Sequence, residues 1–531
     1  MDSKVAADPS SASVNGIYRL VPFGWTTEIL AILAGLAVSF FLFGYFNPYW
    51  RIADQDILLI YDALLQNQGL PREVVYHPAH LSVLALGAMF RLLHALAILR
   101  VDSLSTLPPA SDAGAYNAAW TALVHVARLL SLSFVLAYLT AIVFLLRRLL
   151  GDWRIAVVGL FALTYSGGIA MSVRSVKTEL LSAAFGTLSL LVLLIAARSP
   201  RMTARPVLVG AAALLATLAL DNKVQAIFLV GALPVLMLPF GEPSDGKSYW
   251  SSPRAGRALA ALAAVALLAA AAATPLLLQG LQAPEPQRAF GIGVFQAALA
   301  VWIAFGVLTF SVAWRVPIAE ALASATCIVG GVALGLLPLY LHREASVVAI
   351  VMNPLEAMLS FVSDPAGQCG AAGCGNPIVL FFDSLWGMFR YHTFFLHTSP
   401  RPEIFLEWAV IAGIVFAFRR GERKAALQAA ILIATVWGID TLQTARWLKQ
   451  DYFNYTDPLI VIAAVILLAR VKALQLHPWA FPVGAALVAA HVALSQAEPI
   501  KHAVLMHSGP ENQCAIVEGL KRLEPFPFCR K

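Results

Sequence analysis

The sequence predicts an all-α membrane protein whose helices cross the bilayer many times. Its 531 residues are 59% hydrophobic and only 13% charged, whereas about a quarter of the residues in a soluble domain are charged. A water-soluble fold of this length could not bury so much apolar surface, but lipid can solvate it. The apolar stretches are long, rich in Leu and Ala, and do not alternate with period two, which favours helices over a β-barrel.

Thirteen apolar stretches are predicted to be transmembrane helices. They are 29–46, 117–146, 155–171, 180–197, 206–220, 224–240, 258–279, 293–314, 317–341, 404–418, 425–440, 458–470 and 479–497. A further stretch, 80–100, is long enough to cross the bilayer, but Arg91, His94 and Arg100 are typical of a helix at the membrane interface. We therefore expect 80–100 to be juxtamembrane or re-entrant.

The distribution of Lys and Arg sets the orientation. When 80–100 does not cross, one set of short loops carries 16 basic residues and the opposite set carries 6. The positive-inside rule places the first set, and the N-terminus, in the cytoplasm, and the C-terminus outside. About 28 mixed residues precede the first apolar stretch, so we expect an uncleaved anchor instead of a signal peptide. The net charge of +7 comes without a basic stripe interleaved with aromatic residues, so nucleic acid is not an expected partner.

The predicted domain organisation is simple. Residues 1–470 form a membrane module with long outer segments at 47–116 and 342–403, and residues 471–531 form the last transmembrane helix and a short outer tail. Four cysteines fall outside, where an oxidising compartment permits disulfides, and the expected pairs are Cys369–Cys374 and Cys514–Cys529. Their spacing matches no standard zinc pattern.

The first polar cluster directly follows the first predicted span. Asp54 and Asp56 stand at the start of a helical pattern near 56–67. One interpretation is a helix cap and a carboxylate that complements the helix dipole; the other is a general base at the membrane surface. Two residues apart on a helix do not face the same way, so we favour Asp54 as the base.

The same outer segment continues with Tyr76, His77 and His80, which are candidates for contacting an acceptor. Two histidines are not a metal site, and Pro78 at the start of a helix explains the pattern equally well. The identity of any metal is left open.

Further polar clusters lie on the predicted outer face. Arg174, Lys177 and Glu179 fit either a helix start or an acid paired with cations for an anionic substrate. Lys223 follows Asp221 and Asn222 in a tight turn that does not itself require a lysine, and a lysine can bind phosphate as a point charge.

The last cluster and one intramembrane arginine complete the set. Arg446 and Lys449 alternate with aromatic residues, which fits either an aromatic belt with snorkelling cations or a phosphate clamp. Arg128 lies inside the second span, where it either forms a buried ion pair with an outer carboxylate or joins the phosphate site. No Walker loop, dinucleotide fingerprint or HExxH motif is present, so ATP-driven chemistry has no support.

The order and sidedness of these clusters resemble the GT-C superfamily of membrane glycosyltransferases, especially the branch of the protein O-mannosyltransferases and the lipid A aminoarabinose transferase. The resemblance covers mainly residues 29–240, with weaker echoes to about 470. The residues that carry it are Asp54 with Asp56, Gly69, His77–Pro78, Arg128, the "RRLLG" at 147–151, Arg174 with Glu179, Asn222–Lys223 and Tyr455–Pro458.

This chain departs from the pattern at two positions. The branch usually has adjacent "DE" where this chain has Asp54–Gln55–Asp56, and often Asp where this chain has Glu179. Whether Asp54 or Asp56 is the base, and whether a divalent metal takes part, therefore stays open.

The resemblance implies a GT-C type bundle and transfer of a sugar from a polyprenyl-phosphate donor to a hydroxyl acceptor, which is a lipid, a glycan or a protein. It implies Asp54 as base, with Asp56 the other candidate, and Glu179 as an orienting acid. Inversion would follow from a single displacement. The cations assigned to the donor phosphate are Lys223, Arg174, Lys177, Arg128, Arg446 and Lys449.

Two other classes of protein compete with the enzyme. A transporter or flippase of a lipid-linked sugar also needs charges near the membrane, but it predicts pseudo-symmetric halves that the sequence does not display. A non-catalytic scaffold gives no reason for four polar clusters at one surface. The Ala-rich, Arg-over-Lys composition points to a bacterial inner membrane with a periplasmic outer face.

Overall fold

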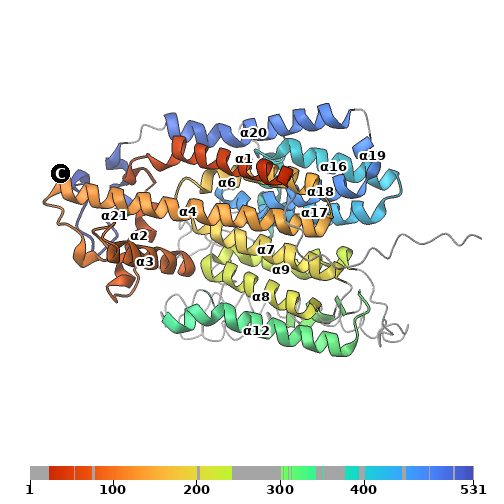
Figure 1. Cartoon of the computed structure of the whole chain (residues 1–531), viewed down its shortest axis with the longest axis horizontal. Coiled ribbons are helices and arrows are strands. Elements are labelled where there is room, and N and C mark those ends of the chain that lie inside the picture. The colour runs from red at the N-terminus through yellow and green to blue at the C-terminus, as the bar shows by residue number, and fades with distance from the viewer. Residues whose placement is uncertain are drawn as a thin grey trace, which may run out of the picture.

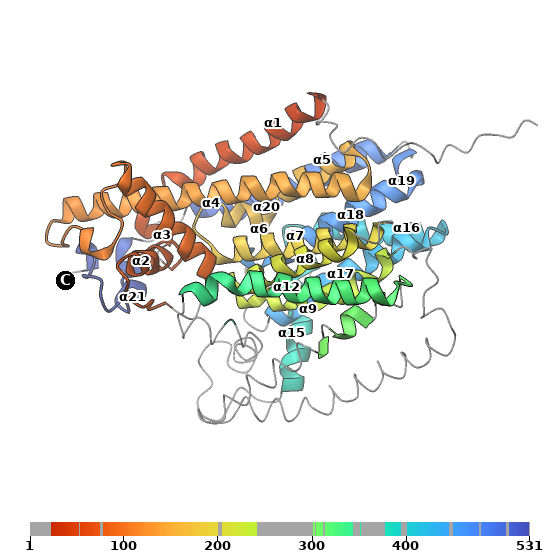
Figure 2. The ribbon, with the colours of Figure 1, turned by 60° about the horizontal axis from the view of Figure 1, so that its bottom comes forward.

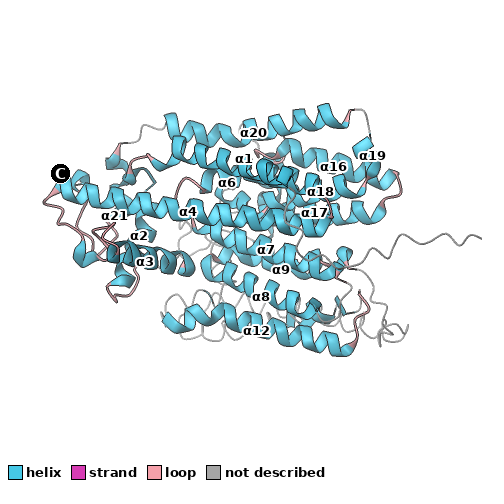
Figure 3. Ribbon diagram, viewed as in Figure 1, coloured by secondary structure: helices cyan, strands magenta, loops and turns pink. Residues whose placement is uncertain are grey.

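A computed structural model gives the fold. It describes residues 23–52, 54–74, 78–199, 204–241, 301–302, 304–308, 310–311, 314–342, 351, 377–393, 401–444, 450–476, 479–505 and 509–529. These residues form helices and loops without any strand (Figure 3). The prediction of an all-α protein is therefore confirmed for this part of the chain.

Most helices run side by side in one bundle (Figure 1). The bundle consists of α1 (Phe23–Phe40), α4 (Ala113–Leu150), α5 (Trp153–Thr164), α6 (Gly167–Ser172), α7 (Thr178–Arg198), α8 (Ala204–Asn222), α9 (Ile227–Leu236), α12 (Ile318–His342), α16 (Ile404–Arg419), α17 (Arg423–Thr444), α18 (Asp457–Arg470), α19 (Lys472–Leu476) and α20 (Ala480–Leu505). Shorter turns are the π-helix Phe41–Tyr45 and the 3-10 helices Tyr49–Ile52, Leu104–Thr106, Val224–Ala226, Leu238–Phe240, Gln450–Tyr455, Pro510–Gln513 and Pro527–Cys529.

Six helical segments of the described chain are long and apolar enough to cross a membrane. They are Trp25–Tyr45, Ala113–Leu150, Thr178–Arg198, Ala204–Asn222, Ile318–His342 and Arg423–Thr444. Helices of this composition require lipid as their solvent, so the chain is an integral membrane protein. The predicted span 258–279 and residues 293–300 of the predicted span 293–314 lie outside the described residues, so the count of thirteen stays a prediction.

Two predicted spans are interrupted. The stretch 155–171 ends its first helix at Thr164 and resumes at Gly167 as α6, where the chain must pass close to another segment: a Cβ at Gly168 would lie 2.6 Å from the backbone nitrogen of Asn454. The stretch 224–240 divides into a 3-10 turn, α9 and a second turn, and Pro234 lies inside α9.

A small cap stands at one end of the bundle. It contains α2 (Asp56–Asn67), α3 (His80–Ala95) and α21 (Cys514–Val517), and in Figure 1 it lies at the left, beside the label for the C-terminus. Helix α4 has 38 residues, which makes it about 57 Å long at 1.5 Å per residue. Because the hydrocarbon core is about 30 Å thick, α4 projects beyond the membrane and carries the cap.

The cap has a hydrophobic core of its own. Leu64 and Leu65 of α2, Phe90 of α3 and Trp120 of α4 are buried there. The C-terminal tail completes this core through Phe526, whose ring packs on the rings of Tyr49, Tyr116 and Trp120. A disulfide joins Cys514 to Cys529 in the tail, as the sequence predicts. The tail therefore packs with the first outer segment.

Helix α3 covers most of the stretch 80–100, which the charged residues predict to be juxtamembrane or re-entrant. It has 16 residues and packs in the cap against α2 and α8. The structure also forms α15 (Pro377–Tyr391) within the outer segment 342–403, where the sequence analysis predicts no helix. Figure 2 shows α15 projecting from the bundle below α9.

Candidate active site

Asp56, at the first position of α2, is completely buried in an ion pair with Arg128 of α4. Nε and Nη2 of Arg128 donate to Oδ2 of Asp56 at 3.0 and 2.7 Å, and the backbone N–H of Val176 donates to Oδ1 at 2.8 Å. The other N–H groups of Arg128 donate to the carbonyl oxygens of Gly44, Tyr45, Asn47 and Pro48.

The protein encloses both partners of this pair. A guanidinium group has five N–H donors, and the protein occupies all those of Arg128. Asp56 is likewise enclosed, so the geometry favours a structural role for both residues. The pair joins the first outer turn to α4, which is the structural alternative that the sequence left open for Arg128.

Asp54, two residues earlier, is on the outside of the same turn. Its side chain is exposed to solvent, and Nε2 of Gln55 donates to it at 3.5 Å. The protein around it nevertheless removes water and raises the pKa of the Asp54 carboxyl above its ordinary value, against an opposing effect of Lys177. Asp54 is therefore an accessible carboxylate beside a cation and without a close ion pair among the described residues.

Two ion pairs with buried lysines lie near one another, and the first of them adjoins Asp54. Lys177, in the loop before α7, binds the carboxylate of Asp451. Lys223, just after α8, lies with its Nζ 2.8 Å from Oε1 of Glu179 in the first turn of α7. Burial lowers the pKa of Lys177, but Asp451, Glu179 and Asp54 outweigh it, and the net pKa is raised. Lys177 therefore stays protonated at neutral pH.

Asp451 is the one residue among these two ion pairs and Asp54 that the sequence did not predict. It lies in the same polar cluster as Arg446 and Lys449, and an acid among cations on the outer face is the signal that could have identified it. The structure brings it to Lys177 across 274 residues of sequence.

Asn222 fixes the position of Lys223. Its Oδ1 accepts hydrogen bonds from both the backbone N–H and the hydroxyl of Ser82, at 3.2 and 2.9 Å, and its Nδ2 donates to the carbonyl of Thr178 at 2.7 Å. Its own carbonyl accepts from the N–H of Ala79 at 2.9 Å. The turn after α8 is therefore joined to the first residues of α3 and α7.

Arg174 does not join the lysines. Its Nη2 donates to Oγ of Ser39 at 2.8 Å and to Oε1 of Gln496 at 3.3 Å, so it faces α1 and α20. No ion pair among the described residues includes it. The grouping of Arg174 with Lys177 that the sequence suggested is therefore not formed.

The remaining candidates divide into one buried residue and several outside the described residues. His80 is buried at the start of α3, and burial lowers its pKa to about 4, so it is neutral at physiological pH. The predicted residues that lie outside the described part of the chain are Tyr76, His77, Cys369, Cys374, Arg446 and Lys449.

A second ionic network, which the sequence analysis misses, lies deeper in the bundle. Arg401 is fully buried and contacts three carboxylates, those of Glu403, Asp440 and Asp457. His392 adjoins it, with Nδ1 2.8 Å from the Glu407 carboxylate. Acids within the predicted spans 404–418 and 425–440 are the signal that could have found it. The network fixes the start of α18, directly after the turn that carries Asp451.

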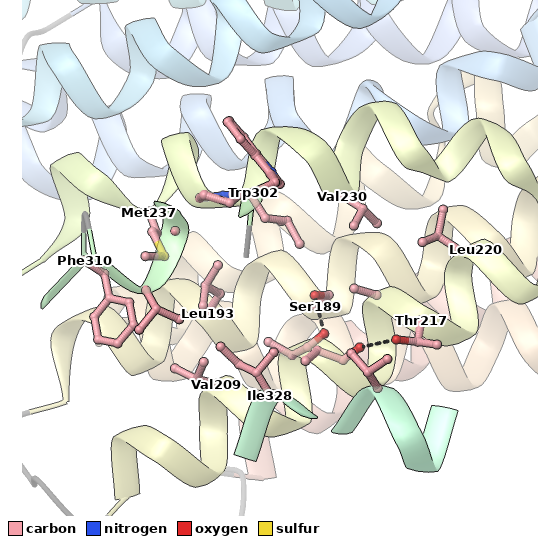
Figure 4. Close-up of a pocket in the computed structure, with 18 of the residues that line it drawn as sticks. Ser189, Leu193, Val209, Thr217, Leu220, Val230, Met237, Trp302, Phe310 and Ile328 are labelled. Carbon is pink, nitrogen blue, oxygen red and sulfur yellow. Dashed lines mark hydrogen bonds between the residues drawn. The ribbon is translucent and has the colours of Figure 1, made fainter. Parts of the chain in front are cut away.

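A long apolar cavity of about 290 Å³ lies between α7, α8, α9, α12 and the segment near Trp302 (Figure 4). The hydroxyls of Ser189 and Thr217 in its wall donate to the carbonyls of Ala212 and Ala213, as the dashed lines in Figure 4 show. The wall is therefore mainly hydrocarbon, with two satisfied hydroxyl groups. Leu220 lines the cavity three residues before Lys223, so α8 connects the cavity with the polar site.

A metal site is not formed by the described residues, because no group of three or more His, Cys, Asp or Glu side chains among them could hold an ion. Two carboxylates lie near Asp54, but that of Asp451 is paired with Lys177 and that of Asp56 with Arg128.

Comparison with known proteins gives one structural similarity. No family model matches the chain, and no curated protein matches it. Among solved structures, the chain is similar to an archaeal oligosaccharyltransferase, AglB from Archaeoglobus fulgidus, in complex with an inhibitory peptide and a dolichol-phosphate. The TM-score is 0.42 with 13% sequence identity, and the similarity covers 90% of this chain and 56% of that one.

Proposed function

We propose that the protein is a GT-C type glycosyltransferase that moves a sugar from a polyprenyl-phosphate donor to a hydroxyl acceptor at the extracytoplasmic membrane surface. The observation that carries the proposal is an accessible carboxylate, Asp54, beside the ion pair of buried Lys177 with Asp451, next to which lies the pair of Lys223 with Glu179. Such an arrangement supplies a base and positive charge within one site.

Asp54 takes the part of the general base. The acceptor hydroxyl oxygen attacks the anomeric carbon, its proton passes to the Asp54 carboxylate, and the bond from that carbon to the lipid phosphate oxygen breaks. The electron pair of that bond goes to the phosphate. A raised pKa suits the role, because a carboxylate with a pKa closer to neutrality is a stronger base. A single displacement of this kind inverts the anomeric centre.

Lys177 and Lys223 stabilise the charge that develops on the departing phosphate. An ammonium group has three N–H donors, so the pair between Lys177 and Asp451 leaves the ammonium of Lys177 able to bind a phosphate oxygen as well. Glu179 holds Lys223 and orients the acceptor. His80, which is neutral, would contact the acceptor as an uncharged group.

The apolar cavity supports a lipid-linked donor. A prenyl chain is pure hydrocarbon, and the wall around Leu193, Phe310 and Met237 is predominantly apolar (Figure 4). Two indole N–H groups of the wall, those of Trp302 and Trp314, are buried without a hydrogen-bond partner. With its tail beside α8, the donor would present its phosphate at the end of that helix, next to Lys223. The disulfide between Cys514 and Cys529 supports an oxidising compartment on the side of the cap, as expected for a periplasmic site.

Transfer of a labelled sugar from a polyprenyl phosphate by the purified full chain tests the proposal. Asp54→Asn removes the base, and we expect turnover to fall by about 10²–10⁴-fold. Asp152→Asn is the matched control, because Asp152 is an exposed cap of α5 and asparagine caps a helix equally well. Wild-type turnover by the Asp54→Asn variant would exclude Asp54 as the base.

The cationic half of the site is tested in parallel. Lys177→Met is expected to lower turnover by slowing departure of the phosphate. Lys424→Met is the control: it changes an exposed lysine in the first turn of α17, and we expect turnover to stay unchanged. If lipid-linked sugar is moved across vesicles with no transfer from any donor, the protein is instead a flippase.

The pH profile gives an independent measurement. Because the pKa of Asp54 is raised in the folded protein, the base is lost as pH falls through a value above the usual range for aspartate. We expect turnover to rise with pH through that value and then to level. In the Asp54→Glu variant the acid limb should shift, while a profile that stays unchanged would assign the limb to another group.

A further inference from the structure

Arg174 occupies an unusual place for a cation. It lies in the loop between α6 and α7, it is 5% exposed, and it packs against the end of α1. Gly44 leaves room for it, because a Cβ at that glycine would be 2.8 Å from Cγ of Arg174. The guanidinium carbon lies 5.7 Å from the centre of the Phe43 ring. All these neighbours are uncharged.

The guanidinium group is not neutralised. Nε and Nη1 are buried and have no hydrogen-bond partner, and Nη2 contacts only the neutral groups of Ser39 and Gln496. Burial lowers the pKa of Arg174 to about 10, and no carboxylate opposes this effect. A buried charge without a partner is costly, so two empty donors on one planar group indicate a missing anion.

The end of the guanidinium group can bind a phosphate oxygen. Nη1 is open and stands next to Nη2, so it can donate a charge-assisted hydrogen bond to an anion beside Ser39. The Ser39 hydroxyl, beside the guanidinium, can donate a second. Arg174 makes no contact with the described ion pairs of Lys177 and Lys223, so this phosphate is not the one that would leave in sugar transfer.

The surroundings favour a lipid as the carrier of the phosphate. Arg174 contacts Ser39 of α1 and Gln496 of α20, two helices that lie at one edge of the bundle in Figure 1. The turn after α1 exposes Leu42 and Phe46 by 69% and 73%, which is typical of side chains that face acyl chains. The site is therefore at the end of a lipid-facing surface.

We propose that Arg174, with Ser39 and Gln496, binds the phosphate group of an anionic membrane lipid that enters between α1 and α20. The lipid would accept from the open Nη1 donor and neutralise the guanidinium. This site does not depend on the proposed sugar transfer, because it would bind such a lipid whether or not Asp54 acts as a base.

The test compares thermal unfolding of the delipidated full chain in neutral detergent with and without phosphatidylglycerol. A ligand that binds only the folded state raises the unfolding midpoint. We expect phosphatidylglycerol to raise it for wild type and for Arg100→Met, which removes an exposed arginine of the cap. We expect no rise for Arg174→Met, and at least tenfold fewer retained lipids by native mass spectrometry.

Two further arms separate the alternatives. In lipid-free detergent, Arg174→Met should unfold at or above the wild-type midpoint, because the variant removes an unpaired buried charge. A midpoint lowered equally with and without lipid would show a purely structural arginine and overturn the proposal. Inorganic phosphate at matched concentration should give a smaller rise than phosphatidylglycerol; an equal rise would make this a site for free phosphate.

A milder variant covers the case in which Arg174→Met does not fold. Gln496→Leu keeps the guanidinium group and removes one of its two neutral partners. We expect it to fold and to weaken lipid retention several-fold. If both Gln496→Leu and Ser39→Ala retain phosphatidylglycerol as wild type does, the site is elsewhere.

Discussion

Two arginines lie against the same glycine and have opposite surroundings. The carbonyl of Gly44 accepts a hydrogen bond from Nη1 of Arg128 at 3.1 Å, and the α-carbon of Gly44 packs on the side chain of Arg174. Around Arg128, a carboxylate and four carbonyls accept every N–H group. Around Arg174, two nitrogens have no acceptor and no carboxylate is near.

The difference separates a structural charge from a binding charge. Arg128 and Asp56 hold one another, so the pair is complete without a ligand and joins the outer turn to α4. Arg174 is equally enclosed but incomplete, so it requires something that the chain does not supply. Residue type and sequence position do not distinguish Arg128 from Arg174. The number of guanidinium N–H groups that have a hydrogen-bond acceptor does.

Removing Arg128 should have the largest effect on stability. Arg128→Met leaves the Asp56 carboxylate buried without its cation, and we expect the free energy of unfolding to fall by about 3–5 kcal/mol. Chemical unfolding in detergent, with the exposed arginine variant Arg420→Met as control, measures the loss. A variant that unfolds like wild type would mean that the two arginines do not differ as described.

Removing both partners should restore part of that loss. In Arg128→Met with Asp56→Leu, no buried charge remains, and we expect to recover about 2 kcal/mol relative to Arg128→Met alone. Recovery is incomplete because the carbonyls of Gly44 to Pro48 lose their donors. If the double variant is less stable than either single variant, the pair does not act as a unit, which a double-mutant cycle would detect.

The shared glycine gives a smaller effect that reaches both arginines. Gly44→Ala places a Cβ within 2.8 Å of Cγ and 2.9 Å of Cβ of Arg174, and we expect about 1 kcal/mol of destabilisation from overpacking. The backbone carbonyl that Arg128 uses remains. The response to phosphatidylglycerol should therefore be lost more completely than stability, and an intact lipid response would show that the side chain of Arg174 can move freely.

The smallest stability effect is expected at Gln496. Gln496→Leu removes a hydrogen bond of 3.3 Å to Arg174 and one of 3.4 Å to the carbonyl of Tyr165. Both are long, so we expect a change of only about 0.5–1 kcal/mol in the free energy of unfolding. A loss as large as that of Arg128→Met would place Gln496 in the structural group instead.

Hydrophobic length predicted most of the bundle. The stretches 180–197 and 317–341 became α7 and α12 with ends shifted by a few residues, because lipid solvation depends on composition over a whole turn. The break at 165–166 and the helix α15 were not predicted. The break depends on how closely Gly168 approaches Asn454, and that contact joins residues far apart in the sequence.

Most residues of the candidate site were expected from the sequence, but the ion pairs that they form were not. Lys177, Glu179 and Lys223 were identified because ionisable residues at the membrane surface are costly. Which acid meets which lysine could not be predicted: Lys177 pairs with Asp451 across 274 residues, and Arg128 pairs with Asp56 across 72. A pattern in one sequence carries residue types but not the distances between remote segments.

The tail that packs on the cap has a consequence for biosynthesis. The Glu524 carboxylate accepts a hydrogen bond from the N–H of Ala110, a separation of 414 residues, and Phe526 packs beside Tyr49, five residues before Asp54. A ribosome adds residues in order, so the early outer segment must wait for nearly the whole chain to be translated and inserted. Until then its aromatic side chains lack their last neighbour. A chain that stops short of the tail would reach the membrane with an unfinished outer surface, which gives quality-control proteases a means to recognise incomplete products.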